Sequence, residues 1–266
     1  MPRDNMASLI QKIARHARTT FKLLPLAEPE TETGAFQDNL NKLRKLLEKI
    51  RPEDLNLGRR RSDGPRHGPP VTYMHICETE YFSMGVFLLQ SGSCIPLHDH
   101  PGMHGLLKVL YGNVAIKCFD KDELEAGGRL EAGAVGVQFN PPLLQCQWAA
   151  LRRSLWRSSE VLDEESGPCL LTPLHSNMHQ IDALDGPAAF LDILAPPYDP
   201  EAGRDCHYFK VLQVSESSGK ASPGPPQQEQ EAVWLLEVPQ PADFWCGGEP
   251  YPGPKVVLDH EAGQRE

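Results

Sequence analysis

Residues 92–112, GSCIPLHDHPGMHGLLKVLYG, decide the fold of this 266-residue chain. They carry two histidines, His98 and His100, and side chains two residues apart point to the same side of an extended strand. An α-helix would turn the two rings about 200° apart. Two prolines and a glycine around the pair favour a short strand that runs into a loop (Pro96, Pro101, Gly102). We therefore interpret the pair as two imidazoles that a β-scaffold presents to one metal ion.

The sequence that follows residue 71 predicts an all-β core. Its apolar segments are short, rich in β-branched and aromatic residues, and broken by Gly, Pro or charged turns roughly every 8–12 residues. No segment is followed reliably by a long amphipathic helix, which disfavours a parallel α/β fold. We expect a sandwich or small barrel, with strands within 71–77, 81–90, 104–119, 134–139, 145–151, 155–162, 188–194, 206–214 and 234–238.

Two helices are expected before the β-region. Residues 6–21 have apolar side chains at helical spacing, with basic residues between them. This leaves open a helix docked on the core or a membrane-surface or mitochondrial-targeting helix, and Asp4 favours the docked one. Residues 35–50 form the second helix, which Pro52 ends. Its apolar stripe consists of Phe36, Leu40, Leu43, Leu47 and Ile50.

The length and composition favour one elaborated domain with terminal additions. We expect helices in residues 1–57 to pack on the barrel, a Gly- and Pro-rich loop at 58–70, and a β-domain from 71 to 266 with a flexible loop at 215–230. Aromatic residues in the Pro- and Gly-rich tail indicate that the tail packs back on the body (Phe244, Trp245, Tyr251).

Composition also limits the partners. The net charge of −10 disfavours non-specific nucleic-acid binding. We find no run of about 18 apolar residues and no charged-then-apolar leader, so neither a membrane span nor a secretory signal is predicted. Seven scattered cysteines without a CxxC pair argue against a zinc ribbon and a disulfide framework. We expect a cytoplasmic monomer, in the cytosol or nucleus.

A metal site needs at least one more ligand, and two histidines downstream are candidates. His179 opens the strand-like run HQIDAL, whereas His175 lies in a turn after Pro173. This favours His179 and keeps His175 as the alternative. The competing interpretation is that these are ordinary surface or core histidines, because the chain has ten of them.

Residues 92–112 resemble the first motif of the cupin family, G-x5-H-x-H-x3,4-E-x6-G. The frame is reproduced, but Gly105 stands where cupins place a glutamate ligand. The second cupin motif, G-x5-P-x-G-x2-H-x3-N, is matched by Gly167 and Pro173, with His179 one residue late. The resemblance implies a double-stranded β-helix (jelly-roll) barrel, here preceded by a helical pair.

In lacking this glutamate, the motif resembles that of the thiol dioxygenases among the cupins. Three neutral imidazoles leave an Fe(II) site more positive than two histidines and a carboxylate do, with one face open, which favours a thiolate ligand beside O2. The two helices, HDHPGMHGLLKVLYG, CHYF and the closing PYPGP extend the resemblance over nearly the whole chain.

This resemblance implies one Fe(II) per chain, bound by His98, His100 and His179, with O2 as co-substrate. Both oxygen atoms pass to the sulfur of cysteamine, giving hypotaurine, or of an N-terminal protein cysteine, giving cysteine sulfinic acid. The resemblance also implies that this sulfinate marks the protein for the Arg/N-degron pathway and couples its stability to oxygen supply. Ordinary thiol reductants do not reverse a sulfinate, so the mark is committed. The alternatives are another cupin oxygenase or isomerase that uses Zn or Mn, and a non-catalytic cupin metal-binding protein.

Asp192 and Tyr198 are candidates for substrate binding. In AAFLDIL, Asp192 shares a strand face with Phe190 and Leu194, where an unpaired carboxylate is costly. Its cation is either the ammonium group of the substrate or an Arg or Lys of the protein. Tyr198, in the following loop, is expected to donate a hydrogen bond to substrate or dioxygen.

Cys206 and Tyr208 form an i, i+2 pair that points to one face of a strand. The residues alone favour two neighbouring core side chains. The resemblance implies more, because in the family this pair can form a Cys–Tyr thioether beside the iron.

Overall fold

The computed structural model describes residues 7–24, 34–60, 68–122, 137–214 and 232–258. The loop predicted at 215–230 and residues 134–136 of one predicted strand lie outside these ranges. None of the helices in the described ranges is both long and apolar enough to cross a membrane.

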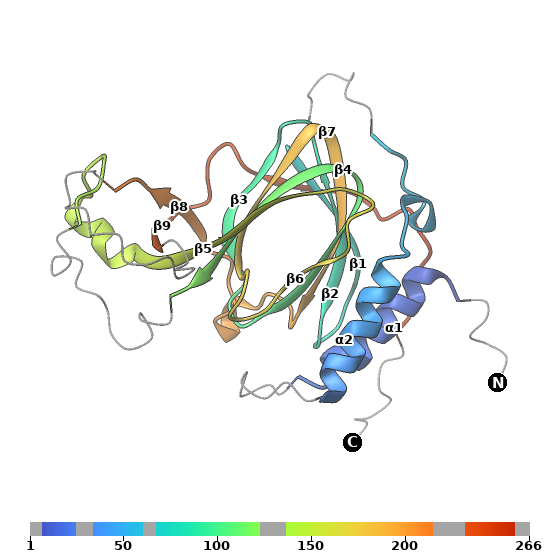
Figure 1. The fold of residues 1–266 in the computed structure, drawn as a ribbon. Coiled ribbons are helices and arrows are strands. Elements are labelled where there is room, and N and C mark those ends of the chain that lie inside the picture. The colour runs from blue at the N-terminus through green and yellow to red at the C-terminus, as the bar shows by residue number, and fades with distance from the viewer. Residues whose placement is uncertain (1–6, 25–33, 61–67, 123–136, 215–231, 259–266) are drawn as a thin grey trace, which may run out of the picture.

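Ten strands of the described chain form one sheet that curls into a barrel (Figure 1). Their order in the sheet is β10-β1-β2-β7-β3-β8-β9-β5-β4-β6, and β7 also pairs with β4. The all-β jelly-roll class predicted from the sequence is therefore confirmed. The strands are β1 Val71–Glu78, β2 Ser83–Leu89, β3 Cys94–Asp99, β4 His104–Lys121, β5 Leu151–Leu162, β6 Cys169–Leu171, β7 Met178–Ala195, β8 Tyr208–Leu212, β9 Ala232–Val238 and β10 Cys246–Gly248.

The long strands β4 and β7 hold the barrel together. They pair antiparallel from His104 opposite Ala195 to Phe119 opposite Met178. On its other edge, β7 pairs first with β3 and then with β2. Because β3 also meets β8 at His98 and Tyr208, the ladder β7-β3-β8-β9-β5-β4 closes on itself. This closure leaves fewer strand edges free to pair with another chain.

The helices α1 (Leu9–Phe21) and α2 (Gly34–Leu47) lie side by side against the outside of the barrel, next to β1 and β2 (Figure 1). Every residue of the apolar stripe predicted for the second helix is at most 2% exposed. The stripe joins a core formed with outward-facing residues of the sheet: Met74, Met84, Val86, Leu191 and Ile193. Ile10, Ile13 and Ala17 of the first helix are buried in the same core, so this helix is docked on the sheet as well. The second helix ends at Leu47, and Pro52 instead begins a 3-10 turn, η2 (Pro52–Leu55).

A second core fills the barrel itself. Along β7, Phe190 points inward to this core, while Leu191 and Ile193 point outward to the helices. This is the alternation expected of a strand that is covered on both faces. The tail also packs back, because Phe244 joins the inner core and Tyr251 contacts the helical one.

Two strand predictions need correction. Residues 145–150 form a 3-10 helix, η5 (Gln145–Ala150), none of whose residues is buried, so no packing favours a strand there. The side chain of Gln147 accepts a hydrogen bond from the Leu144 backbone, at 2.8 Å, and stabilises this turn. In the described part of 134–139, only an isolated bridge at Phe139 occurs. The strand predicted at 188–194 is confirmed as the second half of β7, which reaches it through a bend at Asp185 and Gly186, both with positive φ.

Candidate metal centre

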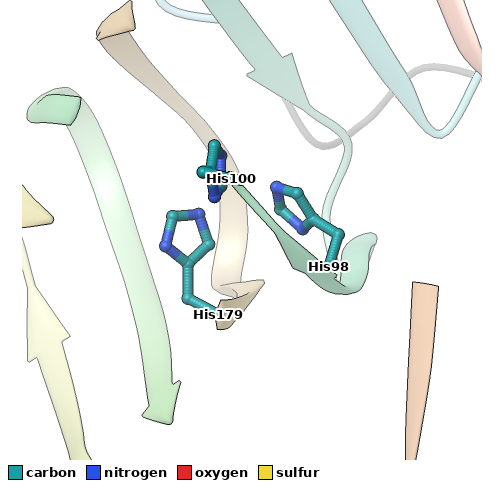
Figure 2. A group of neighbouring side chains, drawn as sticks. All are labelled: His98, His100 and His179. Atoms are coloured by element: carbon teal, nitrogen blue, oxygen red, sulfur yellow. The ribbon is translucent and has the colours of Figure 1, made fainter. Parts of the chain in front are cut away.

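His98, His100 and His179 point toward one another inside the barrel (Figure 2). The ring centroids are 4.7–4.9 Å apart, and one nitrogen of each ring lies within 4.8 Å of the others. His98 belongs to β3, His100 follows that strand directly, and His179 is the second residue of β7. Because His98 and His179 are register partners in the β3–β7 ladder, backbone pairing itself brings the imidazoles together.

Each ring is oriented by a backbone carbonyl. The Nδ1 atom of His98 donates to the Pro96 carbonyl at 2.8 Å, and that of His100 donates to the Asn177 carbonyl at 3.0 Å. The His179 ring is hydrogen-bonded to the carbonyl of Ser176. Such contacts fix the tautomer and the ring direction of metal-binding histidines. With Nδ1 occupied, His98 and His100 each offer Nε2 to a shared ligand.

The three imidazoles are held in their neutral form. Burial lowers the pKa of His98, and burial followed by the neighbouring His98 lowers the pKa of His100 to about 3. The pKa of His179 is well below its usual value, because of burial first and then of the other two rings. Neutral imidazole is the form that binds a metal ion. Within the described residues, the group contains no carboxylate.

Gly105 leaves no room for the glutamate that cupins have at its position. A Cβ atom there would lie 2.7 Å from two side-chain carbons of Leu171 and 3.0 Å from Leu194. These leucines pack together with Met103. Apolar side chains therefore occupy the space that the glutamate side chain would need.

The alternative ligand, His175, lies elsewhere. Its side chain is 60% exposed and faces the carboxylate of Asp120, at 3.4 Å, which also binds Arg157. Of the two downstream candidates, the structure brings His179 and not His175 to the other histidines.

A cavity of about 380 Å³ opens from the three rings. Its wall contains every site residue predicted from the sequence, including Asp192, Tyr198, Cys206 and Tyr208. This volume is within the range of small-molecule sites. Apolar side chains complete most of the wall: Phe87, Ile95, Leu107, Ile181, Phe190, Leu194, Phe244 and Trp245.

Among the described residues, Asp192 is the one carboxylate in this cavity wall. Burial raises its pKa to about 7. Among the described residues, no Arg or Lys forms an ion pair with it, so the protein cation considered from the sequence is absent there. A buried carboxylate without a partner is costly, and a cationic ligand in the cavity would remove that cost.

Cys206 lies between two tyrosines. Burial raises the pKa of its thiol to about 11, against hydrogen bonds with Tyr198 and Tyr208 that lower it. The Tyr198 hydroxyl also donates to the backbone carbonyl of Asp99, at 2.8 Å. The structure therefore brings Cys206 and Tyr208 into contact, and it directs the Tyr198 hydroxyl to the protein.

Two residues that support the site were missed from the sequence. Asn177 is fully buried, and its amide nitrogen donates to the carbonyls of His100, at 2.7 Å, and Thr172, at 3.0 Å. Asp99, between the two histidines, accepts a hydrogen bond from the His207 backbone at 2.9 Å. An Asp between two ligands points to the opposite side of the strand, and this position was the available signal.

The chain is similar in sequence to known proteins. The sequence model of the PCO_ADO family matches residues 46–256. The chain is 57% identical over 263 residues to a 2-aminoethanethiol dioxygenase of Mus musculus, covering 97% of this chain and all of the relative. It is 54% identical over 273 residues to the Homo sapiens protein of that name, covering 96% and 99%.

A plant relative extends the similarity. The chain is 31% identical over 235 residues to plant cysteine oxidase 1 of Arabidopsis thaliana, covering 83% of this chain and 72% of the relative. With a family match over most of its length and relatives aligned from end to end, the chain belongs to the PCO_ADO family.

Proposed function

We propose that this chain is an iron-dependent thiol dioxygenase, which adds both atoms of O2 to the sulfur of cysteamine and of N-terminal protein cysteines. The relatives named 2-aminoethanethiol dioxygenase and plant cysteine oxidase support the thiol chemistry. The observation that carries the proposal is a group of three histidines that opens onto a cavity with an unpaired carboxylate, Asp192.

The donor set suits Fe(II). Three neutral imidazoles, each hydrogen-bonded to a backbone carbonyl, would hold the iron and leave room for further ligands. We assign one iron to His98, His100 and His179. When bound, it supplies the redox chemistry by which a thiolate reacts with O2.

Asp192 binds the amine of the substrate in this proposal. An ammonium group beside the carboxylate favours its ionised form and lowers its pKa from about 7. The resulting charge-assisted hydrogen bond holds the amine at one end of the cavity, and the thiol two carbons away then faces the three rings. Apolar side chains such as Phe190 and Leu107 exclude water around it.

Tyr198, Tyr208 and Cys206 form another part of the cavity wall. Tyr198 is tied to Asp99, and both phenols contact the Cys206 thiol. We assign to Cys206 and Tyr208 the thioether link that the family resemblance implies. Such a link would lock the wall beside His98, whose ring centroid is 6.4 Å from that of Tyr208.

The cellular role follows from the product. An N-terminal cysteine sulfinate commits a protein to the Arg/N-degron pathway, so the enzyme would act in oxygen sensing, as a monomer in the cytosol or nucleus. None of the seven cysteines, all of which lie in the described chain, forms a disulfide, which agrees with a reducing compartment.

Mass spectrometry tests the proposal. The protein is loaded with Fe(II) without oxygen, mixed with cysteamine or a Cys-initiated peptide, and then exposed to ¹⁸O2. We expect stoichiometric sulfinate that carries two labelled oxygen atoms. Loading with Zn(II) or Mn(II) should give none. Oxygen uptake that does not depend on the thiol, or activity with zinc instead of iron, would rule the proposal out.

A further inference from the structure

The cavity at the histidines continues into a second one. The second cavity has a volume of about 500 Å³ and shares part of its wall with the first. Asp192 stands where the two meet, so one carboxylate faces both spaces. The shared wall residues are Phe87, Asp192, Leu194, Tyr198 and Cys246.

The far end of the second cavity holds another carboxylate. Glu78, the last residue of β1, is exposed and lines this space. None of the residues that line either cavity in the described chain is an Arg or a Lys. Apart from the histidines, the titratable charges that the described residues place around the two cavities are therefore the carboxylates of Asp192 and Glu78.

Tyr73 forms the floor between the two carboxylates. Its ring lies over Gly85, where a Cβ atom would be 2.2 Å from the nearest ring carbon. Gly85 is the register partner of Asp192, which places the ring beside that carboxylate. Burial raises the pKa of the Tyr73 hydroxyl, and the charges of Asp192 and Glu78 raise it further. A side chain that crosses this floor thus meets an aromatic face with an anion at each end.

We propose that the second cavity binds the residue that follows the N-terminal cysteine of a protein substrate, and that it prefers a basic side chain. The inference rests on the proposed function, because the thiol at the histidines and the amine at Asp192 leave the peptide carbonyl directed into the second cavity. A Lys or Arg side chain then lies over Tyr73, with its cation near Glu78. Cation–π contact and charge attraction both favour this arrangement.

The test measures binding before reaction. Iron-loaded protein is titrated without oxygen with Cys-Lys-Ala-Ala, Cys-Ala-Ala-Ala and Cys-Glu-Ala-Ala amides, by calorimetry or by the fluorescence of Trp245 in the cavity wall. We expect the Lys peptide to bind about two- to fivefold more tightly than the Ala peptide at low salt, and the Glu peptide more weakly. Added salt should reduce the preference.

Substitutions of Glu78 test whether this residue causes the preference for the Lys peptide. Glu78→Gln should bring the Lys-to-Glu affinity ratio toward one, and Glu78→Lys should invert it. Glu80→Gln removes the same charge from an exposed residue outside both cavities and should leave the ratio unchanged. General damage to the protein would weaken all three peptides alike and leave the ratio as it was.

The outcomes separate the two proposals. No preference in the wild type, an unchanged ratio in Glu78→Gln, or an equal effect of Glu80→Gln overturns the basic-residue subsite. Oxygen admitted afterwards tests the reaction independently: charge-dependent binding without sulfinate would keep the subsite and reject the dioxygenase.

Discussion

At the residue scale, the proposed iron site consists of three side chains, and the described residues contain no second group of this kind. Replacing His100 or His179 with Ala is expected to reduce bound iron from about one per chain to near zero, because two imidazoles alone hold Fe(II) weakly. His175→Ala is the matched control, since that side chain is exposed and bound to Asp120. Iron is measured by a colorimetric chelator after anaerobic loading and desalting. Equal loss from His175→Ala would contradict the ligand assignment.

Asp192 allows a test of substrate orientation. Asp192→Asn should raise the KM for cysteamine more than the KM for 2-mercaptoethanol, which has a hydroxyl in place of the amine. A lost charge-assisted hydrogen bond corresponds to about 1.5–3 kcal/mol, or roughly tenfold or more in KM. Steady-state oxygen consumption with both thiols gives the comparison. Parallel losses for the two thiols would remove the amine-binding role.

The same substitution should stabilise the protein as pH rises. Burial raises the pKa of Asp192 from 3.8 to about 7, so the folded state prefers the protonated form. The stability that this provides is complete below pH 3.8 and is lost as pH rises through about 7. Without a ligand, Asp192→Asn should therefore gain on the wild type between pH 5 and 8, by about 1–4 kcal/mol. Urea unfolding of the metal-free proteins measures this, and a constant difference across that range would contradict it.

The sequence predicted the residues of the site better than their contacts. His98 and His100 could be paired because strand geometry has a fixed period, and Asp192 because its neighbours are apolar. The partners of Asn177 and Asp99 could not be predicted, because they bond to His100 and His207 across gaps of 77 and 108 residues. Only the closed barrel brings such segments together.

At the scale of elements, the contact between β4 and β6 explains why the ligand set lacks a carboxylate. Gly105 pairs with Leu171 in this ladder, and the leucine side chain fills the space over the glycine. Gly105→Ala should cost about 1–3 kcal/mol of stability through overpacking. Leu171→Ala should cost about 2–5 kcal/mol through the space that it leaves.

The two changes together should cost less than their sum, because the added methyl group occupies the space that the leucine leaves. Denaturant unfolding of the four proteins measures the coupling. Strict additivity would mean that Leu171 does not block this position.

The elements themselves were predictable where periodicity was strong. The stripe of α2 and the alternation in β7 gave the correct buried faces. The 3-10 helix η5 was missed because its aromatic residue, Trp148, favours a strand, while its exposure and the Gln147 contact favour a turn. Local composition does not reveal which face a short segment will bury.

At the scale of the whole molecule, the N-terminal helix holds the C-terminal segment in position. Gln11 of α1 donates to the Val257 carbonyl at 2.9 Å and accepts from the Val257 backbone at 2.8 Å. Gln11→Ala should cost about 1–3 kcal/mol and increase amide exchange around residues 246–258, while iron binding is retained.

Hydrogen-exchange mass spectrometry measures this effect. Lys12→Ala is the control, because that neighbouring side chain is exposed. Unchanged exchange in Gln11→Ala would show that the segment is held by its other contacts, such as Asn56 with the Pro252 carbonyl.

The pairing of β10 with β1 sets the order in which the molecule can mature. The three clustered histidines of the site precede residue 180, whereas Trp245 and Cys246 of the cavity wall come much later in the chain. A chain still on the ribosome can gather its ligands before it can enclose a substrate, and contacts between such distant segments form late. The unfinished protein would then hold an open redox metal, so loading with iron is best deferred until the last strand has docked.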